Sequence, residues 1–169
     1  RLGILPDPKS RGGSSAIHAD FQAGHVIEIG YPRNNFPLRL NAGHSVLFAG
    51  GIGITPILSM AYALASAGRS YELHYCGRST SRLAFIDELK RFGDNVHVHL
   101  DDGPDHQRLD INAVLASPSA SRHLYVCGPN GFMDFVTSAA ERAGWSIDSV
   151  HLERFGAEVN TDGAPFTVV

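Results

Sequence analysis

The chain has 169 residues, enough for one hydrophobic core or for one domain and part of a second. Hydrophobic residues make up 43% and charged residues 18% of it, as in ordinary globular proteins, and the net charge of −3 includes no basic run of the kind that binds nucleic acid. The nine histidines lack the spacing of a helical zinc site, and no apolar stretch is long enough to span a membrane. The two cysteines, Cys76 and Cys127, end separate apolar runs, which favours a reduced, cytoplasmic protein over a disulfide framework.

The first 44 residues differ in character from the rest. They contain four prolines and a Gly-Gly-Ser-Ser turn at residues 12–15. Residues 25–32, HVIEIGYP, partly alternate apolar and polar side chains, and this period of two predicts a half-buried strand of an antiparallel sheet. This pattern leads us to interpret residues 1–44 as the C-terminal end of an all-β domain. Because the first residue is Arg1 rather than Met, we expect that domain to begin upstream.

From residue 45 onward, short apolar runs alternate with helical patterns. The runs predict strands at residues 45–50, 70–77, 122–128 and 149–155, and the alternating segment NVHVHL predicts a further strand at residues 95–100. Helices are predicted at residues 56–67, 81–93, 110–115 and 129–144, with Pro56 and Pro129 at helix starts and Asp110 as an N-cap. This alternation predicts an α/β fold in which a parallel sheet of five strands is covered by helices on both faces. Residues 157–169 have little to bury and are interpreted as a linker.

Three glycines crowd the end of the first predicted parallel strand, in VLFAGGIGITPI at residues 46–57. Gly50, Gly51 and Gly53 would let the backbone turn sharply and let a ligand approach closely. The helix that follows would direct its free N–H groups at the same place, as suits an anion such as a pyrophosphate. Thr55 could cap that helix or contact the ligand. A tight turn that binds nothing would use the same residues.

A second turn of this kind is YVCGPNGFM, residues 125–133, at the end of the fourth strand. Cys127 would lie at the mouth of a crevice, although a small buried thiol has the same sequence signature. Since the carboxyl ends of parallel strands share one edge of a sheet, the two Gly/Pro turns together predict the floor of a ligand crevice there.

The segments GGIGITP, CGP and LERF, in this order and spacing, resemble the nicotinamide-binding domain of the ferredoxin–NADP reductase superfamily. Within it, the chain is similar to reductase components of Rieske oxygenases, of the phthalate dioxygenase reductase and vanillate O-demethylase oxidoreductase type. RGGSSAIH at residues 11–18 and YPRNNFPL at residues 31–38 are similar to the flavin-phosphate loop and barrel end of that family. The resemblance covers nearly the whole chain.

This resemblance implies three parts: residues 1–44 as the remnant of an FMN-binding β-barrel, residues 45–156 as the NAD(P)-binding domain, and residues 157–169 as a linker toward a 2Fe–2S ferredoxin domain. The Arg-x-Tyr-Ser flavin segment and the cysteine ligands of the cluster do not occur in the chain. The chain would therefore be the middle part of a longer enzyme. The resemblance implies that this parent enzyme passes hydride from NADH to FMN and single electrons through the cluster to a terminal oxygenase. It would have no nucleic-acid or membrane partner.

The resemblance also implies residue roles. Cys127, Thr55 and Phe155 would lie at the reacting rings, where the cofactors carry the hydride chemistry and no general acid or base is needed. The nicotinamide nucleotide and the edge of the flavin would be bound by Gly50, Gly51, Gly53, Thr55, Pro56, Cys127, Gly128, Pro129, Met133, Glu153 and Phe155. The flavin phosphate would be bound by Gly12, Gly13, Ser14 and Ser15, helped by the charge of Arg11. A core aromatic at position 155 and an ordinary polar loop at 11–15 are the structural alternatives.

The type of nicotinamide nucleotide stays open. Arg78, Ser79 and Arg82 follow the second strand, where they could bind the 2′-phosphate of NADPH or simply be solvated. The resemblance favours NADH. Two other functions remain: an FAD- and NADPH-dependent ferredoxin or flavodoxin reductase, and a non-catalytic nucleotide-binding module.

Overall fold

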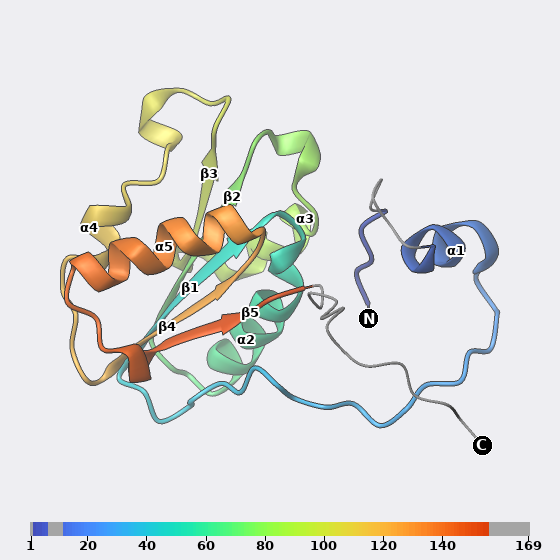
Figure 1. The fold of residues 1–169 in the computed structure, drawn as a ribbon, viewed down its shortest axis with the longest axis horizontal. Coiled ribbons are helices and arrows are strands. Elements are labelled where there is room, and N and C mark those ends of the chain that lie inside the picture. Colours follow the sequence, from blue (N-terminus) through green and yellow to red (C-terminus); the bar gives the residue numbers. More distant parts are fainter. Residues whose placement is uncertain (1, 7–11, 156–169) are drawn as a thin grey trace, which may run out of the picture.

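A computed structural model describes residues 2–6 and 12–155 of the chain. Its centre is one parallel sheet of five strands in the order β3-β2-β1-β4-β5 (Figure 1). The strands are β1 (His44–Gly50), β2 (Tyr71–Gly77), β3 (Val96–Leu100), β4 (Arg122–Cys127) and β5 (Val150–Glu153). The chain builds outward from β1 to one edge, then crosses back and builds to the other. The predicted α/β fold with five parallel strands is confirmed.

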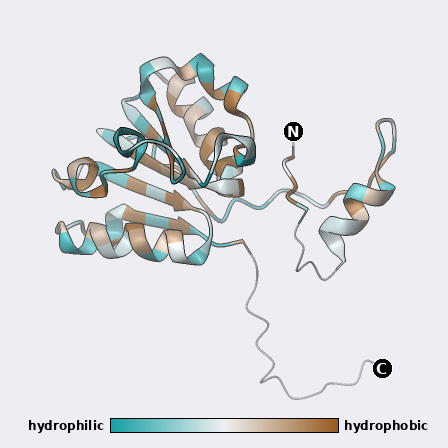
Figure 2. Cartoon of the chain, turned by 90° about the horizontal axis from the view of Figure 1, so that it is seen from above, coloured by the Kyte–Doolittle hydropathy of each residue, from teal (hydrophilic) through white to brown (hydrophobic). Residues whose placement is uncertain are grey.

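Helices cover both faces of the sheet, as Figures 1 and 2 show. Helix α2 (Ile54–Ser66) packs on one face, over a core that includes Leu47, Leu73 and Tyr75. Helices α4 (Ile111–Leu115) and α5 (Asn130–Arg142) pack on the other face, over Phe48 and Val126. The remaining helices of the described residues are α1 (Gly13–Asp20), α3 (Ile86–Leu89), and the short 3-10 helices η1 (Gly51–Gly53), η2 (Thr80–Arg82), η3 (Lys90–Asn95), η4 (Asp105–Gln107) and η5 (Ile147–Ser149). No helix among residues 2–6 and 12–155 is long and apolar enough to cross a membrane.

The single helix predicted at residues 81–93 is wrong. The structure divides that stretch into η2, α3 and η3, and Phe85, immediately before α3, has a left-handed backbone with φ 61°. Two tertiary contacts explain the break. The Leu83 side chain packs onto Gly77, and the N–H of Ala84 donates to the Tyr75 hydroxyl at 3.0 Å instead of to a helical carbonyl.

The helix ends mostly follow the predicted signals. Asp110 caps α4 by accepting a hydrogen bond from the Ala113 N–H at 3.1 Å. Gly68 and Gly144, with φ 60° and 84°, terminate α2 and α5. Pro56 is the third residue of α2 and not the first, which costs nothing because N–H groups in the first turn have no helical partner.

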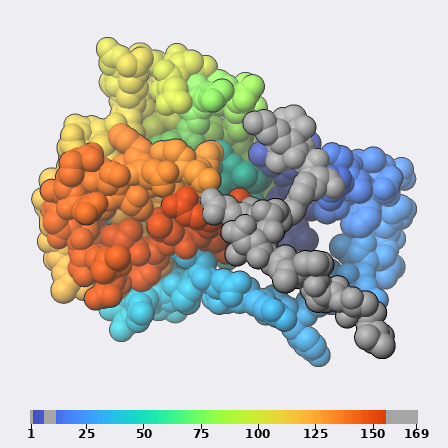
Figure 3. All heavy atoms as spheres, viewed as in Figure 1, coloured from blue at the N-terminus to red at the C-terminus, as the bar shows by residue number. Residues whose placement is uncertain are grey.

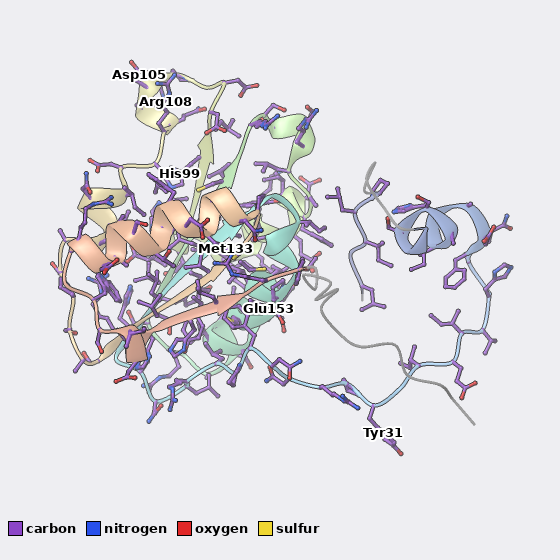
Figure 4. The ribbon with its side chains drawn as sticks, in the orientation of Figure 1. Tyr31, His99, Asp105, Arg108, Met133 and Glu153 are labelled. Carbon is purple, nitrogen blue, oxygen red and sulfur yellow. The ribbon has the colours of Figure 1, made fainter. Side chains whose placement is uncertain are left out.

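The strand predicted at residues 25–32 is also wrong. These residues have no regular secondary structure, and the side chains of Val26 and Tyr31 are each 98% exposed. A strand needs a neighbour for its backbone groups, and among the described residues none pairs with this segment. Figure 1 shows α1 and this segment set apart from the sheet, and Figure 4 shows Tyr31 away from it. The barrel remnant at 1–44 therefore stays a prediction, and the predicted linker at 157–169 lies outside the described residues.

The sheet domain takes in residues before the predicted boundary at 45. Phe36 is buried and meets the ring of Tyr125 edge-on at 5.9 Å, and the N–H of Arg39 donates to the Tyr125 hydroxyl at 2.9 Å. Figure 3 shows the sheet and its helices as one packed body, with the blue N-terminal segment beside it. Residues 36–42 therefore fasten the incoming chain to the α2 face of the sheet.

Candidate functional site

The strand order reverses between β1 and β4, and this point is where open α/β sheets bind ligands. The chain leaves β1 into α2 on one face and leaves β4 into α5 on the other (Figure 1). The first turns of both helices consequently flank the carboxyl ends of β1 and β4. Both N-termini bring partly positive backbone N–H groups to this edge, which favours an anionic ligand.

Three glycines let the two turns touch through their backbones. A Cβ on Gly53 would lie 2.1 Å from the carbonyl oxygen of Cys127 and 2.7 Å from the Gly128 nitrogen. A Cβ on Gly128 would lie 3.0 Å from the Cα of Gly50. No other residue type fits at position 53 without separating the turns. The predicted convergence of the two motifs is therefore present in the structure.

Gly51 is different from its neighbours because it faces open space. Its φ of 53° is left-handed, and a Cβ built on it would meet no atom within 4 Å. The Thr55 hydroxyl, the other polar group of this turn, donates to the carbonyl of Ile52 at 3.1 Å. The turn is thus held by its own hydrogen bond, while the backbone at Gly51 stays approachable by a flat or anionic group.

Cys127 is fully buried at the end of β4, on the α2 face of the sheet, and not at the mouth of the crevice. Burial raises the pKa of its thiol to about 12, and the carboxylate of Glu153, its register partner on β5, adds to this rise. A hydrogen bond with the backbone of Gly128 opposes the shift without reversing it. The thiol therefore remains neutral at physiological pH and is not a nucleophile.

Met133 is also fully buried, in the core cluster between α5 and the sheet, below the ribbon of α5 in Figure 4. Its predicted cofactor contact is not available in the structure, because α5 places every third or fourth residue against the sheet and position 133 falls on that stripe. Gly128 and Pro129, by contrast, are partly or fully exposed at the start of α5.

Glu153 ends β5 and lines a surface cavity of about 500 Å³. The cavity continues over Pro56 and Met60 of α2 and along the chain at Arg33 and Phe36. Phe155 follows, and 52% of its surface is exposed. The alternative prediction, that Phe155 packs in the core, is therefore wrong. The structure thus brings Glu153 and Pro56 to one cavity, with Phe155 two residues beyond.

On the opposite side of β1, the loop after β2 carries Arg78, Ser79 and Arg82. Both arginines are exposed, and the hydroxyls of Ser79 and Ser81 lie 3.1 Å apart. A second cavity, of about 220 Å³, lies next to this loop and is lined by Gly3, Thr55, Leu58, Ser59, Tyr62, Phe85 and Glu88. Phe85 is the one non-glycine residue with a positive φ among the described residues, a conformation that clusters at ligand sites.

Sequence reasoning did not find Tyr75 or Phe85. Tyr75 looks like an ordinary core aromatic, since its strand position faces inward, and only its hydrogen bonds reveal a contact with both loops. The break at Phe85 depends on contacts with β2 that no local pattern carries.

The predicted flavin-phosphate residues do not join the crevice. Gly12, with φ 107°, precedes α1, and Gly13, Ser14 and Ser15 form its first turn. Figure 1 shows α1 well apart from the glycine turns. Arg11 lies outside the described residues. Among residues 2–6 and 12–155, no cluster of His, Cys, Asp or Glu could hold a metal ion.

Comparison with known proteins agrees with this geometry. Residues 47–138 match the model of the oxidoreductase NAD-binding domain family, and this range contains both glycine turns. Vanillate O-demethylase oxidoreductase from Pseudomonas sp. (strain HR199 / DSM 7063) is 49% identical over 99% of this chain and 54% of its own length. Phthalate dioxygenase reductase from Burkholderia cepacia is 39% identical over 99% of this chain and 53% of its own length.

Solved structures show the same relationship. A phthalate dioxygenase reductase, described as a modular structure for electron transfer from pyridine nucleotides to [2Fe-2S], superposes with a TM-score of 0.83 at 39% identity, over 92% of this chain and 49% of that chain. An intact type IV self-sufficient cytochrome P450 monooxygenase also gives 0.83, at 38% identity, over 92% of this chain and 20% of that chain. The chain spans about half the length of the curated relatives it matches. Its fold, its paired glycine turns and the family match over more than half of its residues show that the chain belongs to the oxidoreductase NAD-binding domain family.

Proposed function

We propose that this chain is the nicotinamide-binding part of a reductase that passes hydride from NADH to FMN, and electrons onward through a 2Fe–2S centre to a terminal oxygenase. The observation that carries the proposal is the backbone contact between the β1–α2 and β4–α5 turns, with Gly51 left open beside it. Reductases named for vanillate demethylation and phthalate dioxygenation are the relatives that support the oxygenase partner.

The residues present fit a nicotinamide nucleotide. The open backbone at Gly51 has room for a group that a side chain would block, and the helix N-termini beside it favour its pyrophosphate. A bound nucleotide would supply hydride chemistry, with a flavin as the acceptor. The buried thiol of Cys127 is neutral and would exchange no proton with the rings, while the backbone at the end of β4 would help to align them.

The positions of Glu153 and Phe155 favour a flavin-binding site at the β5 side of the crevice. The cavity beside Glu153 is bounded by α2 and by residues 32–38, and Phe155 is exposed enough to cover a ring that enters there. We assign FMN on the resemblance of residues 11–18 to a flavin-phosphate loop, and FAD is the alternative. Gly12, Gly13, Ser14 and Ser15 would bind the phosphate if α1 lay against the sheet domain in the parent protein.

NADH is the proposed donor, although Arg78 and Arg82 leave a site for the 2′-phosphate of NADPH. Both side chains are exposed, and neither has a carboxylate partner among the ion pairs of the described residues. The two free cysteines support a reducing, cytoplasmic setting.

The test is an anaerobic titration of the 169-residue chain with FMN, FAD and the two reduced nucleotides. We expect NADH to bind more tightly than NADPH and to reduce added FMN, seen as a loss of its absorbance. NADPH preference together with FAD reduction would instead indicate a ferredoxin or flavodoxin reductase. Nucleotide binding without reduction of either flavin would indicate a non-catalytic nucleotide-binding module. Failure of both nucleotides to bind would overturn the proposal.

A further inference from the structure

The hydroxyl of Tyr75 connects two loops that are far apart in sequence. It donates to the carbonyl of Gly51 at 3.1 Å, in the turn after β1. It also accepts the N–H of Ala84 at 3.0 Å, in the loop after β2. Tyr75 is itself fully buried on the α2 face of the sheet. One rigid ring in the core therefore fixes the separation of the two loops at the carboxyl edge.

Both bonds use backbone groups that have few alternatives. Gly51 occupies a left-handed conformation, and Ala84 lies between the 3-10 helix η2 and the left-handed Phe85, where the chain makes no regular helix. Burial raises the pKa of Tyr75, with the Ala84 N–H opposing, so the phenol keeps its proton and donates at physiological pH. Losing the oxygen would leave a backbone donor and an acceptor in this region without their partner.

The two loops carry different halves of the proposed nucleotide site. Gly51 belongs to the turn expected to take the pyrophosphate and the nicotinamide. Ala84 follows Arg78, Ser79 and Arg82, the residues at the strand end where the adenosine ribose would lie. A dinucleotide must contact both loops at once, and its affinity depends on their being held at the right spacing before it binds.

We infer that Tyr75 is a positioning residue that couples the two halves of the dinucleotide site, an inference that rests on the proposed function. The tyrosine touches neither half of the ligand. Because its one hydroxyl bonds both loops, ordering of the 78–85 loop by a ligand also orders the Gly51 turn, so that binding to one loop favours binding to the other. Linkage requires this coupling to be reciprocal: an adenosine ligand on the 78–85 loop must strengthen binding at the glycine turn by the same factor that it gains.

The principal test compares Tyr75→Phe with Tyr125→Phe in the 169-residue chain. Tyr125 is the matched control because it is also fully buried on the α2 face, and its hydroxyl also receives a backbone N–H. That N–H belongs to Arg39, in the chain before β1, and Tyr125 lies on β4 rather than on β2. Dissociation constants are measured for NADH, for AMP and for reduced nicotinamide mononucleotide. For Tyr75→Phe, NADH should bind about tenfold more weakly, while each half molecule changes by less than about twofold. Tyr125→Phe should leave all three constants within about twofold.

Equal losses in the two variants, or half molecules weakened as much as NADH, would overturn the inference while the proposed function stood. If the unsubstituted chain bound no nicotinamide nucleotide, the proposed function would fail and this inference with it.

A second measurement needs no substitution and covers the case in which Tyr75→Phe does not fold. In the unsubstituted chain, saturating AMP should slow the hydrogen exchange of the amides at Gly51–Gly53 and tighten the binding of reduced nicotinamide mononucleotide by about threefold or more. If AMP changed neither the hydrogen-exchange rate of the amides at Gly51–Gly53 nor the affinity for the mononucleotide, the inferred coupling would be wrong.

Discussion

Replacing Gly53 with alanine tests whether the two turns are held together by direct backbone contact. Gly53 has φ −59° and ψ −8°, a conformation that alanine adopts easily. Backbone conformation alone would therefore make Gly53→Ala stabilising by about 0.4–1 kcal/mol, through the unfolded chain. The new Cβ, however, would lie 2.1 Å from the carbonyl oxygen of Cys127 and 2.4 Å from the carbonyl carbon of the same residue. The two effects have opposite signs, which makes the outcome decisive.

The steric clash of the new Cβ should outweigh the stabilisation that comes from the unfolded chain. Relief requires one turn to move by roughly an ångström, because real Cβ atoms essentially never approach closer than 3.0 Å. The neighbouring atoms are backbone and cannot rotate away. Overpacking of this kind costs about 1–3 kcal/mol, so the net loss in the free energy of unfolding should be about 1–2 kcal/mol. A displacement of that size should also slow hydride transfer by roughly a hundredfold.

Urea denaturation at equilibrium measures the stability change, with Gly131→Ala as the control. Gly131 lies in the first turn of α5, its φ is not left-handed, and a Cβ there meets no atom within 4 Å. That control should be neutral or slightly stabilising, since alanine favours a helix over glycine. If Gly53→Ala were as stable as Gly131→Ala, the two turns would not be in contact and the account of the crevice floor would be wrong.

Three further predictions concern single groups. The pKa of His99 is lowered to about 4, by burial first and then by the charge of His74, so between pH 6.5 and 4 the unfolded chain binds a proton that the folded chain does not. The free energy of unfolding should therefore fall as the pH drops through this range, and the fall should be less steep in His99→Gln. Equal slopes in the two proteins would contradict this. Cys127 should react with iodoacetamide at neutral pH far more slowly in the folded than in the unfolded chain, because its thiol is buried and its pKa is about 12; rapid labelling of the folded chain would refute this. Phe155→Ala should change the unfolding free energy by less than about 0.5 kcal/mol, because the ring is half exposed, yet it should slow reduction of added FMN; a loss of stability with unchanged reduction would point to a core role instead.

The parts of the fold that the sequence predicts are those with local causes. The central strands β1 and β4 are short apolar runs because both of their faces are buried, and Gly68 and Gly144 mark helix ends because φ at these positions is positive. The crevice followed from the same logic: glycine clusters at two strand ends must meet when the strands are parallel neighbours. The long-range contact of Gly53 with Cys127 gives that expectation its physical basis.

What could not be predicted depends on residues distant in sequence. The helix expected at residues 81–93 is interrupted because the Tyr75 hydroxyl captures the N–H of Ala84. Residues 25–32 alternate as a strand would, but a strand forms only where a neighbour supplies hydrogen bonds. Met133 belongs to a sequence motif and yet faces the core, since a motif does not state which side of its helix each residue occupies.

We expect a nicotinamide nucleotide to bind where β1 and β4 end. The most direct measurement is an NMR titration of the 169-residue chain with NAD⁺ that follows every backbone amide. We expect the largest chemical-shift changes at Gly51, Gly53 and Gly128, smaller ones at residues 78–85, and almost none at the opposite edge of the sheet near Ser45 and Tyr71. Changes concentrated at that opposite edge, or none at the three glycines under saturating nucleotide, would contradict it.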